Sequence, residues 1–288
     1  MNDTSSEQKS YFDIHTSGIG YLQRVREVPV KGGRKAQPFL ACTIAALVGP
    51  ARDPILRYFD VRVSGAEAKK LVQPYLGIED RQQRPLIRFR LGDLWLDPFR
   101  RPSSGEPAAS MKARLLKAEL LDRSVLRDIE QHELHTNGIG YLNNPRMLSN
   151  DGAPLMSCSL AVLAGPTDSP EYRYIETVVA DDSAQELLQR CVQAVEAKQK
   201  VLLAFKLNDM RAEAYNRTKG EHAGEVGASL KSKLIHVSLI KIDGQQVYPS
   251  QSDAPETETI DSVPTDSEGS QTAAPSQAPE APALAASF

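Results

Sequence analysis

The sequence contains one segment twice, and this internal repeat constrains the fold more than any other feature. HTSGIGYL at positions 15–22 recurs as HTNGIGYL at positions 135–142. Two dipeptides, GP at 49–50 and RY at 57–58, recur at 165–166 and 173–174. Their offset is 116 rather than 120, so the first copy has four extra residues around positions 31–37. A repeat of this length indicates two copies of one structural unit, each long enough to bury its own core.

The repeat divides the chain into five segments. We assign residues 1–10 to a disordered N-terminus, 11–122 to domain 1, 123–130 to a linker, 131–245 to domain 2 and 246–288 to a disordered tail. Residues 250–288 contain no Lys or Arg, and they contain seven Asp or Glu residues among Pro, Ser, Thr, Ala and Gln. Such a composition buries too little apolar surface to offset the entropy lost on ordering.

Each unit shows the same order of predicted elements. In the first copy, hydrophobic periodicity indicates strands at 19–28, 39–48 and 57–63, a helix at 65–76, and strands at 86–96 and 111–121, with a hairpin loop at 98–109. This is the order of the five-stranded OB-fold barrel, although another small barrel or an α+β sheet has the same elements. We predict a mainly β protein with two tandem OB-fold-like barrels, each with one helix between strands 3 and 4, and a disordered acidic tail.

Charge differs between the two copies. The whole chain has a formal net charge of -3, but residues 11–122 hold 19 Lys and Arg against 12 Asp and Glu, a net charge of +7. Residues 132–244 hold 12 against 14, a net charge of -2. Because positive charge supplies much of the affinity for a phosphate backbone, we expect domain 1 to be the main nucleic-acid binder, with the acidic tail as its competitor.

Basic and aromatic side chains form the predicted binding face, because single-strand binding combines cations with rings on which bases stack. Alternation places Arg88 and Arg90 opposite Phe89, although such a stripe can also be simply the solvated side of a barrel. The candidate residues of domain 1 are Tyr21, Arg24, Arg26, Tyr58, Arg62, Arg88, Arg90, Trp95, Phe99, Lys112 and Arg114. The secondary set in domain 2 is Tyr141, Tyr174, Lys206, Tyr215, Lys231 and Lys233. We expect Phe89 and Phe205 to fill the cores instead.

The run from 43 to 76 resembles bacterial single-stranded-DNA-binding proteins. It contains an apolar strand, a hairpin, the strand RYFDVRV and a glycine before an amphipathic helix, and FRL at 89–91 is followed by Trp95. HTxGIGYL together with GDLW is more specifically similar to an uncharacterised family carried on integrating conjugative elements and genomic islands. That family is described at most as replication or single-strand-binding-like, and usually has one unit. The resemblance implies single-stranded DNA as partner and pairing of chains into a homo-oligomer, a dimer.

Two glycines in each copy could suggest a nucleotide-binding loop. Gly18 and Gly20 recur as Gly138 and Gly140, but the third glycine and the following helix of a dinucleotide fingerprint are missing. We interpret the pair as a strand bulge or a close approach of the first strand.

The remaining reactive residues predict no chemistry. His15 and His135 repeat once per copy without metal-ligand spacing, so we expect hydrogen-bonded structural histidines. Cys42, Cys158 and Cys191 lack the spacing of a disulfide framework or zinc site, and we expect the first two in the cores. No catalytic triad, Walker motif or carboxylate pair is present. We therefore predict a protein that is not an enzyme and has no cofactor and no metal.

The leading hypothesis is a non-enzymatic single-stranded-DNA-binding protein of a mobile element, serving replication or transfer of an integrating conjugative element mainly through domain 1. The alternative is a protein-interaction or scaffold module of a conjugative or replication complex, and a third hypothesis is an RNA-binding OB protein. The resemblance makes the terminal Phe288 a candidate contact for replication or conjugation proteins, although residues 281–287 contain no acid and the tail can also simply solubilise. No apolar run approaches the roughly 18 to 20 residues of a membrane span, and MNDTSSEQKS lacks a signal-peptide core, so we expect a cytoplasmic location without membrane contact.

Overall fold

The structure is a computed structural model that describes residues 14–30, 38–78, 80, 82–150, 153–164 and 171–249. The chain separates into the units Met1–Ala254 and Pro255–Phe288, and everything below belongs to the first unit. The predicted disordered N-terminus, Phe288 and residues 250–288 of the predicted tail lie outside the described residues.

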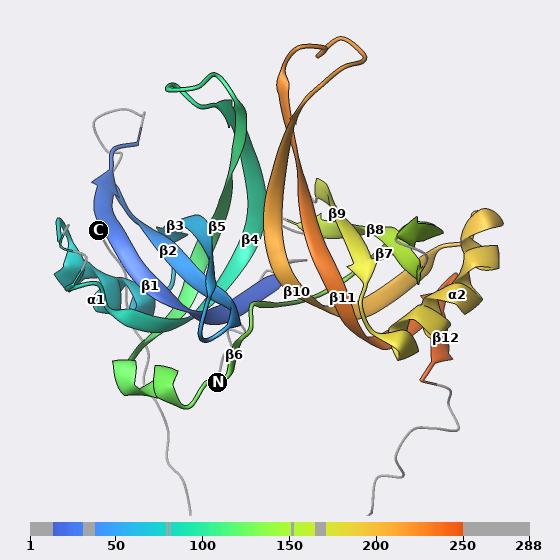
Figure 1. The fold of residues 1–288 in the computed structure, drawn as a ribbon, viewed down its shortest axis with the longest axis horizontal. Coiled ribbons are helices and arrows are strands. Elements are labelled where there is room, and N and C mark those ends of the chain that lie inside the picture. Colours follow the sequence, from blue (N-terminus) through green and yellow to red (C-terminus); the bar gives the residue numbers. More distant parts are fainter. Residues whose placement is uncertain are drawn as a thin grey trace, which may run out of the picture. The chain divides into compact units, whose positions relative to one another are not determined.

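The first repeat is a closed five-stranded barrel (Figure 1). Its elements are β1 (His15–Val28), β2 (Phe39–Pro50), β3 (Ile55–Val63), α1 (Ala66–Val72), the 3₁₀ turn η1 (Gln73–Tyr75), β4 (Leu86–Arg100) and β5 (Pro107–Leu121). β1 pairs with β2 and with β4, β2 pairs with β3, β3 pairs with β5 in parallel, and β4 pairs with β5. The order β1-β2-β3-β5-β4, closed onto β1, with the helix between strands 3 and 4, is that of an OB barrel, as predicted.

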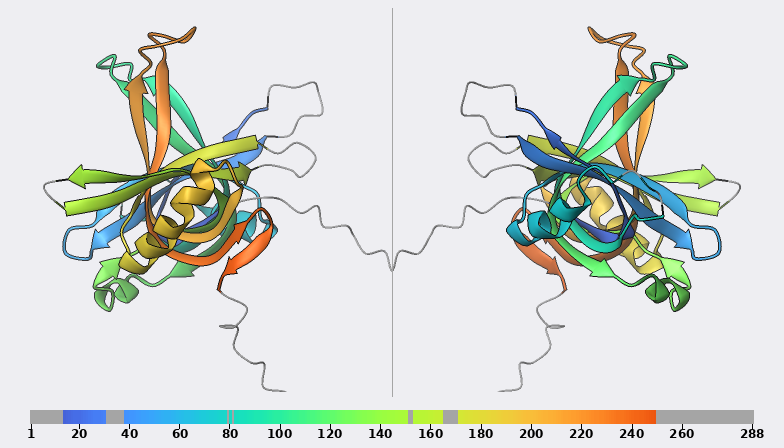
Figure 2. Two further views of the ribbon diagram at one scale, coloured as in Figure 1. Left: turned by 90° about the vertical axis from the view of Figure 1, so that its right-hand side faces the viewer. Right: turned by 90° about the vertical axis from the view of Figure 1, so that its left-hand side faces the viewer.

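The second repeat closes in the same way. Its elements are β7 (His135–Asn150), β8 (Ala153–Ala164), β9 (Glu171–Val179), α2 (Asp182–Glu196), β10 (Val201–Asn216) and β11 (Val226–Ile242). The pairs β7–β8, β8–β9, parallel β9–β11, β10–β11 and β10–β7 repeat the pairing of the first barrel. Asp181 caps α2 by accepting a hydrogen bond from the Ala184 amide at 2.8 Å, and α2 lies over its barrel in Figure 2.

Alternating side chains fill the cores. In β4, Ile87, Phe89 and Leu91 are buried while Arg88 and Arg90 between them are exposed, as the alternation predicts. Phe205 and the thiols of Cys42 and Cys158 are buried as well. One cluster of buried side chains runs through both barrels.

Three boundaries differ from the prediction. β4 extends to Arg100 and β5 begins at Pro107, so the predicted loop at 98–109 is reduced to residues 101–106. Pro98 is tolerated in β4 because it lies in the two-stranded end of the hairpin, where its missing N–H removes no hydrogen bond from the barrel. The linker forms a 3₁₀ turn, η2 (Arg123–Arg127), and β6 (Gln131–His132), assigned to domain 2, pairs with β2 of repeat 1. Finally, β12 (Gln245–Tyr248) pairs with β11, so residues 246–248, placed in the disordered tail, form a strand.

The two first strands join the barrels. β1 and β7 pair antiparallel, with Thr16 opposite Thr136, and their hydroxyl oxygens lie 2.9 Å apart. Residues 120 positions apart therefore meet each other, so the repeats are related by a local two-fold axis at this threonine pair. Described strands of both repeats form one twelve-stranded sheet.

The repeated glycines serve close packing at this junction. A Cβ on Gly18 would lie 3.2 Å from Leu134 Cδ1, and a Cβ on Gly138 would lie 2.7 Å from Ile14 Cγ2. A Cβ on Gly20 would lie 2.5 Å from the Ala45 carbonyl oxygen. The close-approach interpretation is thus confirmed, whereas the bulge interpretation is wrong for these positions. Gly18 pairs with Phe89, and Gly20 pairs with Ile87 and Ala46, without a register shift, and the bulge of β1 lies between Gln23 and Arg26.

Candidate nucleic-acid interface

A row of directly paired residues crosses the outer face of the first barrel. It runs from Gln23 in β1 through Thr43, Asp60 and Lys112 to Trp95 in β4. Because paired residues on neighbouring strands point to the same side of a sheet, the five side chains share one face. The structure therefore brings Trp95 and Lys112 onto the face that also carries Tyr58 and Arg62.

A groove of about 1130 Å³ lies on this face. Its lining includes Arg24 and Arg26 from the bulge of β1, Leu56 and Tyr58 from β3, and Arg84 from the segment before β4. Tyr58 is 53% exposed. Arg24 has a φ of +52°, unusual for a residue with a Cβ, and such bulges re-aim side chains. The groove thus combines an exposed ring with three guanidinium-bearing residues.

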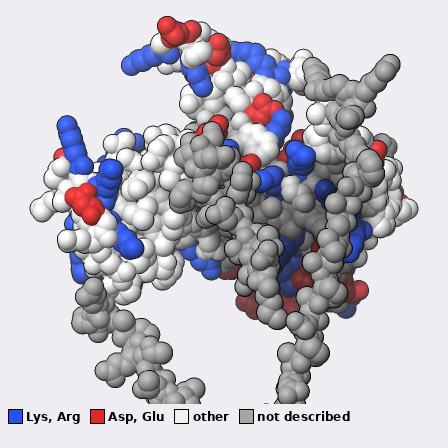
Figure 3. Space-filling view, turned by 180° about the vertical axis from the view of Figure 1, so that it is seen from behind, with Lys and Arg blue, Asp and Glu red and all other residues white. Residues whose placement is uncertain are grey.

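Most predicted cations of this face already have partners within the chain. Arg26 Nη2 lies 2.8 Å from Asp60 Oδ1, Lys112 forms an ion pair with Asp97, and the Arg62 guanidinium lies 4.8 Å from the centre of the Phe39 ring. These ion pairs are partly exposed, so each contributes little to stability and can exchange for a phosphate oxygen. Figure 3 shows the same interleaving on the back of the molecule, where blue Lys and Arg side chains lie beside red Asp and Glu side chains.

Asp93 links this face to the other repeat. It sits in a bulge of β4 with a φ of +53°, a conformation that Asp tolerates better than most residues. Its Oδ2 lies 3.4 Å from Arg114 Nε, and its Oδ1 accepts a hydrogen bond from Arg173 Nη1 at 2.8 Å. The predicted binding residue Arg114 therefore shares its carboxylate with a residue of repeat 2.

Eight of the eleven predicted residues of domain 1 do not line the groove. Arg88 and Arg90 pair with Ile19 and Ser17 of β1, and the Arg88 guanidinium forms a 2.8 Å ion pair with Glu119. Tyr21 lies beside Ala45, with the Arg123 guanidinium 5.9 Å from its ring centre. The structure thus divides the predicted set between two regions of the barrel surface.

The second repeat presents the same row with different chemistry. Asn143, Ser159, Glu176, Lys231 and Arg211 take the places of the five residues above. An arginine thus replaces the tryptophan, and Lys231 forms an ion pair with Glu176. Of the other predicted residues, Tyr174 and Tyr215 are 59% and 46% exposed, Lys233 is exposed opposite Val178, and Tyr141 and Lys206 are half-buried. Phe99, the counterpart of Tyr215, is 41% exposed.

Several residues of these faces were not predicted from the sequence. Tyr172, at 54% exposure, stands beside Tyr174 in the same alternation of β9, so the period-2 pattern could have identified it. Arg84 comes from an irregular segment, and no periodic signal precedes it. Asp60 was not recognised because its role depends on the cross-strand neighbour Arg26.

Other reactive groups are buried within the barrels. Burial raises the pKa of the Cys42 thiol to about 12 and that of Cys158 to about 12. Within the described ranges, no three His, Cys, Asp or Glu residues are placed to hold a metal ion. No helix in the described part of the chain is long and apolar enough to cross a membrane.

Comparisons with known proteins find both repeats. The family model described as “Protein of unknown function (DUF3577)” matches residues 5–122 and, a second time, residues 126–256. The crystal structure of wild-type single-stranded DNA binding protein from Thermus aquaticus is similar with a TM-score of 0.43 and 11% identity, over 79% of this chain and 92% of that chain. A replication protein A heterotrimer bound to single-stranded DNA gives a TM-score of 0.20 and 9% identity, over 82% and 52% of the respective chains. No curated protein matches the sequence.

Proposed function

Because the chain belongs to the family described as “Protein of unknown function (DUF3577)” and carries its unit twice, we propose a function from the groove itself: the protein binds single-stranded DNA, mainly on repeat 1. The observation that carries this proposal is the exposed Tyr58 ring beside Arg24 and Arg26 in the groove across the barrel face. In OB barrels this face and its flanking hairpins are where oligonucleotides bind.

The chemistry of the groove suits an unpaired strand. A base can stack on the exposed Tyr58 ring whatever its identity, while the guanidinium groups of Arg24 and Arg26 attract the backbone phosphates. A duplex would hide the faces of its bases from Tyr58. Repeat 2 retains the exposed Tyr174 but has Val178 where repeat 1 has Arg62, which supports repeat 1 as the stronger site.

The test is a titration with an oligo-dT of about 15 nucleotides, a length within the range that one OB barrel covers. Trp95 is the only tryptophan, and it lies at the end of the row that crosses the groove face, so its fluorescence reports binding. We expect quenching, and an affinity that falls steeply as salt rises. An unchanged signal together with no mobility shift at low salt would contradict the proposal.

A scaffold function is favoured by one observation, the pairing of Arg26, Lys112 and Arg88 with acids of the same chain. A protein partner would bind without the salt dependence that phosphate contacts produce. An RNA-binding protein would prefer oligo-U to oligo-dT in a direct competition, since the 2′-hydroxyl distinguishes the two.

The biological setting belongs to the same proposal. We propose that the protein is non-enzymatic, cytoplasmic and dimeric, and that it serves replication or transfer of an integrating conjugative element. The HTxGIGYL and GDLW motifs support this setting through their resemblance to the mobile-element family. Co-purification from cells carrying such an element, with and without its transfer origin, tests the setting independently of the DNA affinity.

A further inference from the structure

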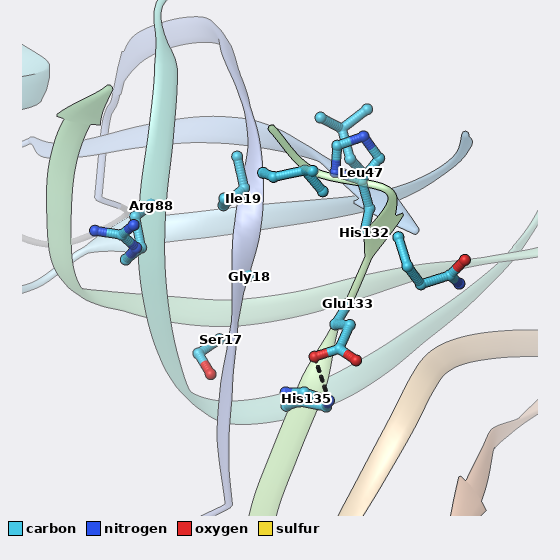
Figure 4. A pocket seen from close by; sticks show the side chains of 10 residues that line it. Ser17, Gly18, Ile19, Leu47, Arg88, His132, Glu133 and His135 are labelled. Atoms are coloured by element: carbon cyan, nitrogen blue, oxygen red, sulfur yellow. Dashed lines mark ion pairs between the residues drawn. The ribbon is translucent and has the colours of Figure 1, made fainter. Parts of the chain in front are cut away.

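A separate pocket of about 300 Å³ lies where the segment between the repeats crosses the first barrel (Figure 4). Backbone hydrogen bonds fix this segment at both ends: the Ala51 amide donates to the Glu130 carbonyl at 2.9 Å, and the Asp209 amide donates to the Leu134 carbonyl at 3.1 Å. Between them, β6 pairs with Gly49 and Pro50. The pocket is therefore preformed rather than created by ligand binding.

One wall carries a buried polar atom that the protein leaves unsatisfied. His132 is 5% exposed, and its Nδ1 has no hydrogen-bond partner among the described residues. Burial lowers the pKa of His132, so the ring is neutral near pH 7 and Nδ1 can donate or accept, depending on the tautomer. Buried polar groups are nearly always hydrogen-bonded, so a turn of the ring that brings Nδ1 to the pocket would gain a hydrogen bond to a ligand group.

The charged groups of the lining disfavour an anion. Glu133 lines the pocket, with Oε2 3.2 Å from His135 Nε2, and a carboxylate can accept further hydrogen bonds. Arg88 also lines it, but its guanidinium lies 2.8 Å from Glu119. A phosphate in the pocket would therefore lie beside the Glu133 carboxylate, which repels it.

The rest of the lining combines the apolar side chains of Ile19, Leu47 and Ile129 with the Ser17 hydroxyl and the Gln131 amide. Apolar walls with a few hydrogen-bonding groups are typical of sites for small organic ligands. A nucleobase matches this set, because its rings cover apolar surface, and an exocyclic amino group donates to a carboxylate such as Glu133, as cytosine N4 does. A neutral imidazole can donate to the adjacent ring nitrogen or carbonyl.

We propose that this pocket binds one amino-bearing nucleobase, with cytosine as the defining case, taken from a bound strand or from a free nucleotide. For a base within a strand, the inference rests on the proposed single-strand binding, which brings the strand to the barrel. Thymine lacks the amino group, so the pocket discriminates against it.

The test uses the full chain and two kinds of probe. Imidazole NMR of His132 is followed during titration with deoxycytidine or thymidine monophosphate, and affinities for oligo-dC and oligo-dT are compared. We expect the cytidine nucleotide to shift the His132 resonances more than the thymidine nucleotide. We expect oligo-dC to bind more tightly than oligo-dT. This dC-to-dT affinity ratio should be roughly three- to tenfold larger in the wild type than in Glu133→Ala. Asn137→Ala, in the equivalent pocket beside Gly138, is the matched control and keeps the wild-type ratio.

The outcomes separate the pocket from the groove. If neither nucleotide shifts the His132 resonances, and the wild type and Glu133→Ala have equal dC-to-dT affinity ratios, the pocket proposal is wrong. This holds even if oligo-dT quenches Trp95 fluorescence and so supports binding in the groove. A His132 shift with the cytidine nucleotide in a protein that binds no oligonucleotide supports the pocket and contradicts the proposed function. Because Glu133 is exposed at the surface, its substitution leaves the fold intact.

Discussion

Asp93 and Arg173 form an ion pair between the two repeats, with 2.8 Å between Asp93 Oδ1 and Arg173 Nη1. The residues at the equivalent positions, Asp209 and Arg57, form the reciprocal pair, with 2.7 Å between Oδ1 and Nε and 3.1 Å between Oδ2 and Nη2. Both aspartates have a positive φ, so the same bulge in each repeat aims its carboxylate at the other barrel.

This reciprocity predicts a measurable coupling energy. The Arg57 and Asp209 side chains are 20% and 16% exposed, so their hydrogen bonds are protected from water. We expect a double-mutant cycle of Arg57→Ala and Asp209→Ala, read by urea unfolding, to give about 1–3 kcal/mol. The exposed pair Glu67 and Lys70 is the control and should give about 0.3–0.5 kcal/mol. Equal values for the two pairs would contradict the role of the aspartates in joining the repeats.

Stacking on Tyr58 predicts an asymmetry between the repeats. Tyr58→Ala should weaken oligo-dT binding by about 1–3 kcal/mol, whereas Tyr58→Phe, which keeps the ring, should bind nearly as the wild type does. Tyr174→Ala is the matched change in repeat 2 and should cost less. A larger loss for Tyr174→Ala, measured by fluorescence titration, would place the main site on repeat 2.

The pairing of Arg26 with Asp60 predicts that removing an acid strengthens binding. Asp60→Asn keeps the shape but frees the Arg26 guanidinium from its 2.8 Å contact, so affinity for oligo-dT should rise. Arg24→Ala should lower the slope of log affinity against log salt by about 0.7 if Arg24 contacts one phosphate. Lys70→Ala on α1 serves as the control for general charge. An Asp60→Asn protein with weaker binding would show that Asp60 orients Arg26 rather than competing for it.

The repeated glycines predict graded losses of stability. A Cβ at Gly20 would meet the Ala45 backbone at 2.5 Å, whereas at Gly18 its nearest neighbours are side-chain atoms at 3.2 Å. Gly20→Ala should therefore lower the free energy of unfolding by about 1–3 kcal/mol, and Gly18→Ala by less, because a side chain can yield where backbone cannot. Thermal unfolding of the two variants checks the order, and a reversed order would contradict the packing described for β1.

The buried thiols predict the pH dependence of stability at the alkaline end. Burial raises the pKa of Cys42 and Cys158 to about 12, above the unfolded value of 9.0, so unfolding releases protons once the pH exceeds 9.0. Each thiol's contribution to the free energy of unfolding is fully present below pH 9.0. Between pH 9.0 and the folded pKa it declines, with a slope that approaches about 1.4 kcal/mol per pH unit. Native protein should react with a thiol reagent only at the rate of unfolding. Rapid labelling of both residues without urea would contradict their burial.

The barrels could be predicted from the sequence because their information is local. Alternation in residues 86–91 and the helical spacing in 66–72 identify a strand and a helix, and the repeat confirms their order. The OB topology follows once the single helix falls between the third and fourth strands.

The site could be predicted only in part, because much of it depends on pairing across strands. Alternation puts Tyr58 and Arg62 on one face of their strand, and Lys112 and Arg114 on one face of theirs, but it cannot show that Arg26 meets Asp60, thirty-four positions away. Arg88 has the same alternation as Lys112 and yet lies elsewhere on the barrel, since strand curvature decides which polar residues converge. The junction pairs of Asp93 and Asp209 need the relation between the repeats, which no single strand encodes.

The exchange of Ile14 and Leu134 has a consequence for how the duplicated chain unfolds and diverges. Ile14 packs against Gly138 of the second barrel, and Leu134 packs against Gly18 of the first. Each barrel therefore packs against a residue that precedes the first strand of the other barrel. We expect the two repeats to unfold as one cooperative unit. Surface positions outside these contacts are not constrained by them, and Trp95 of repeat 1 corresponds to Arg211 in repeat 2. The duplication thus produced two barrels that share one packed junction, while the outer surface of either barrel can diverge in sequence.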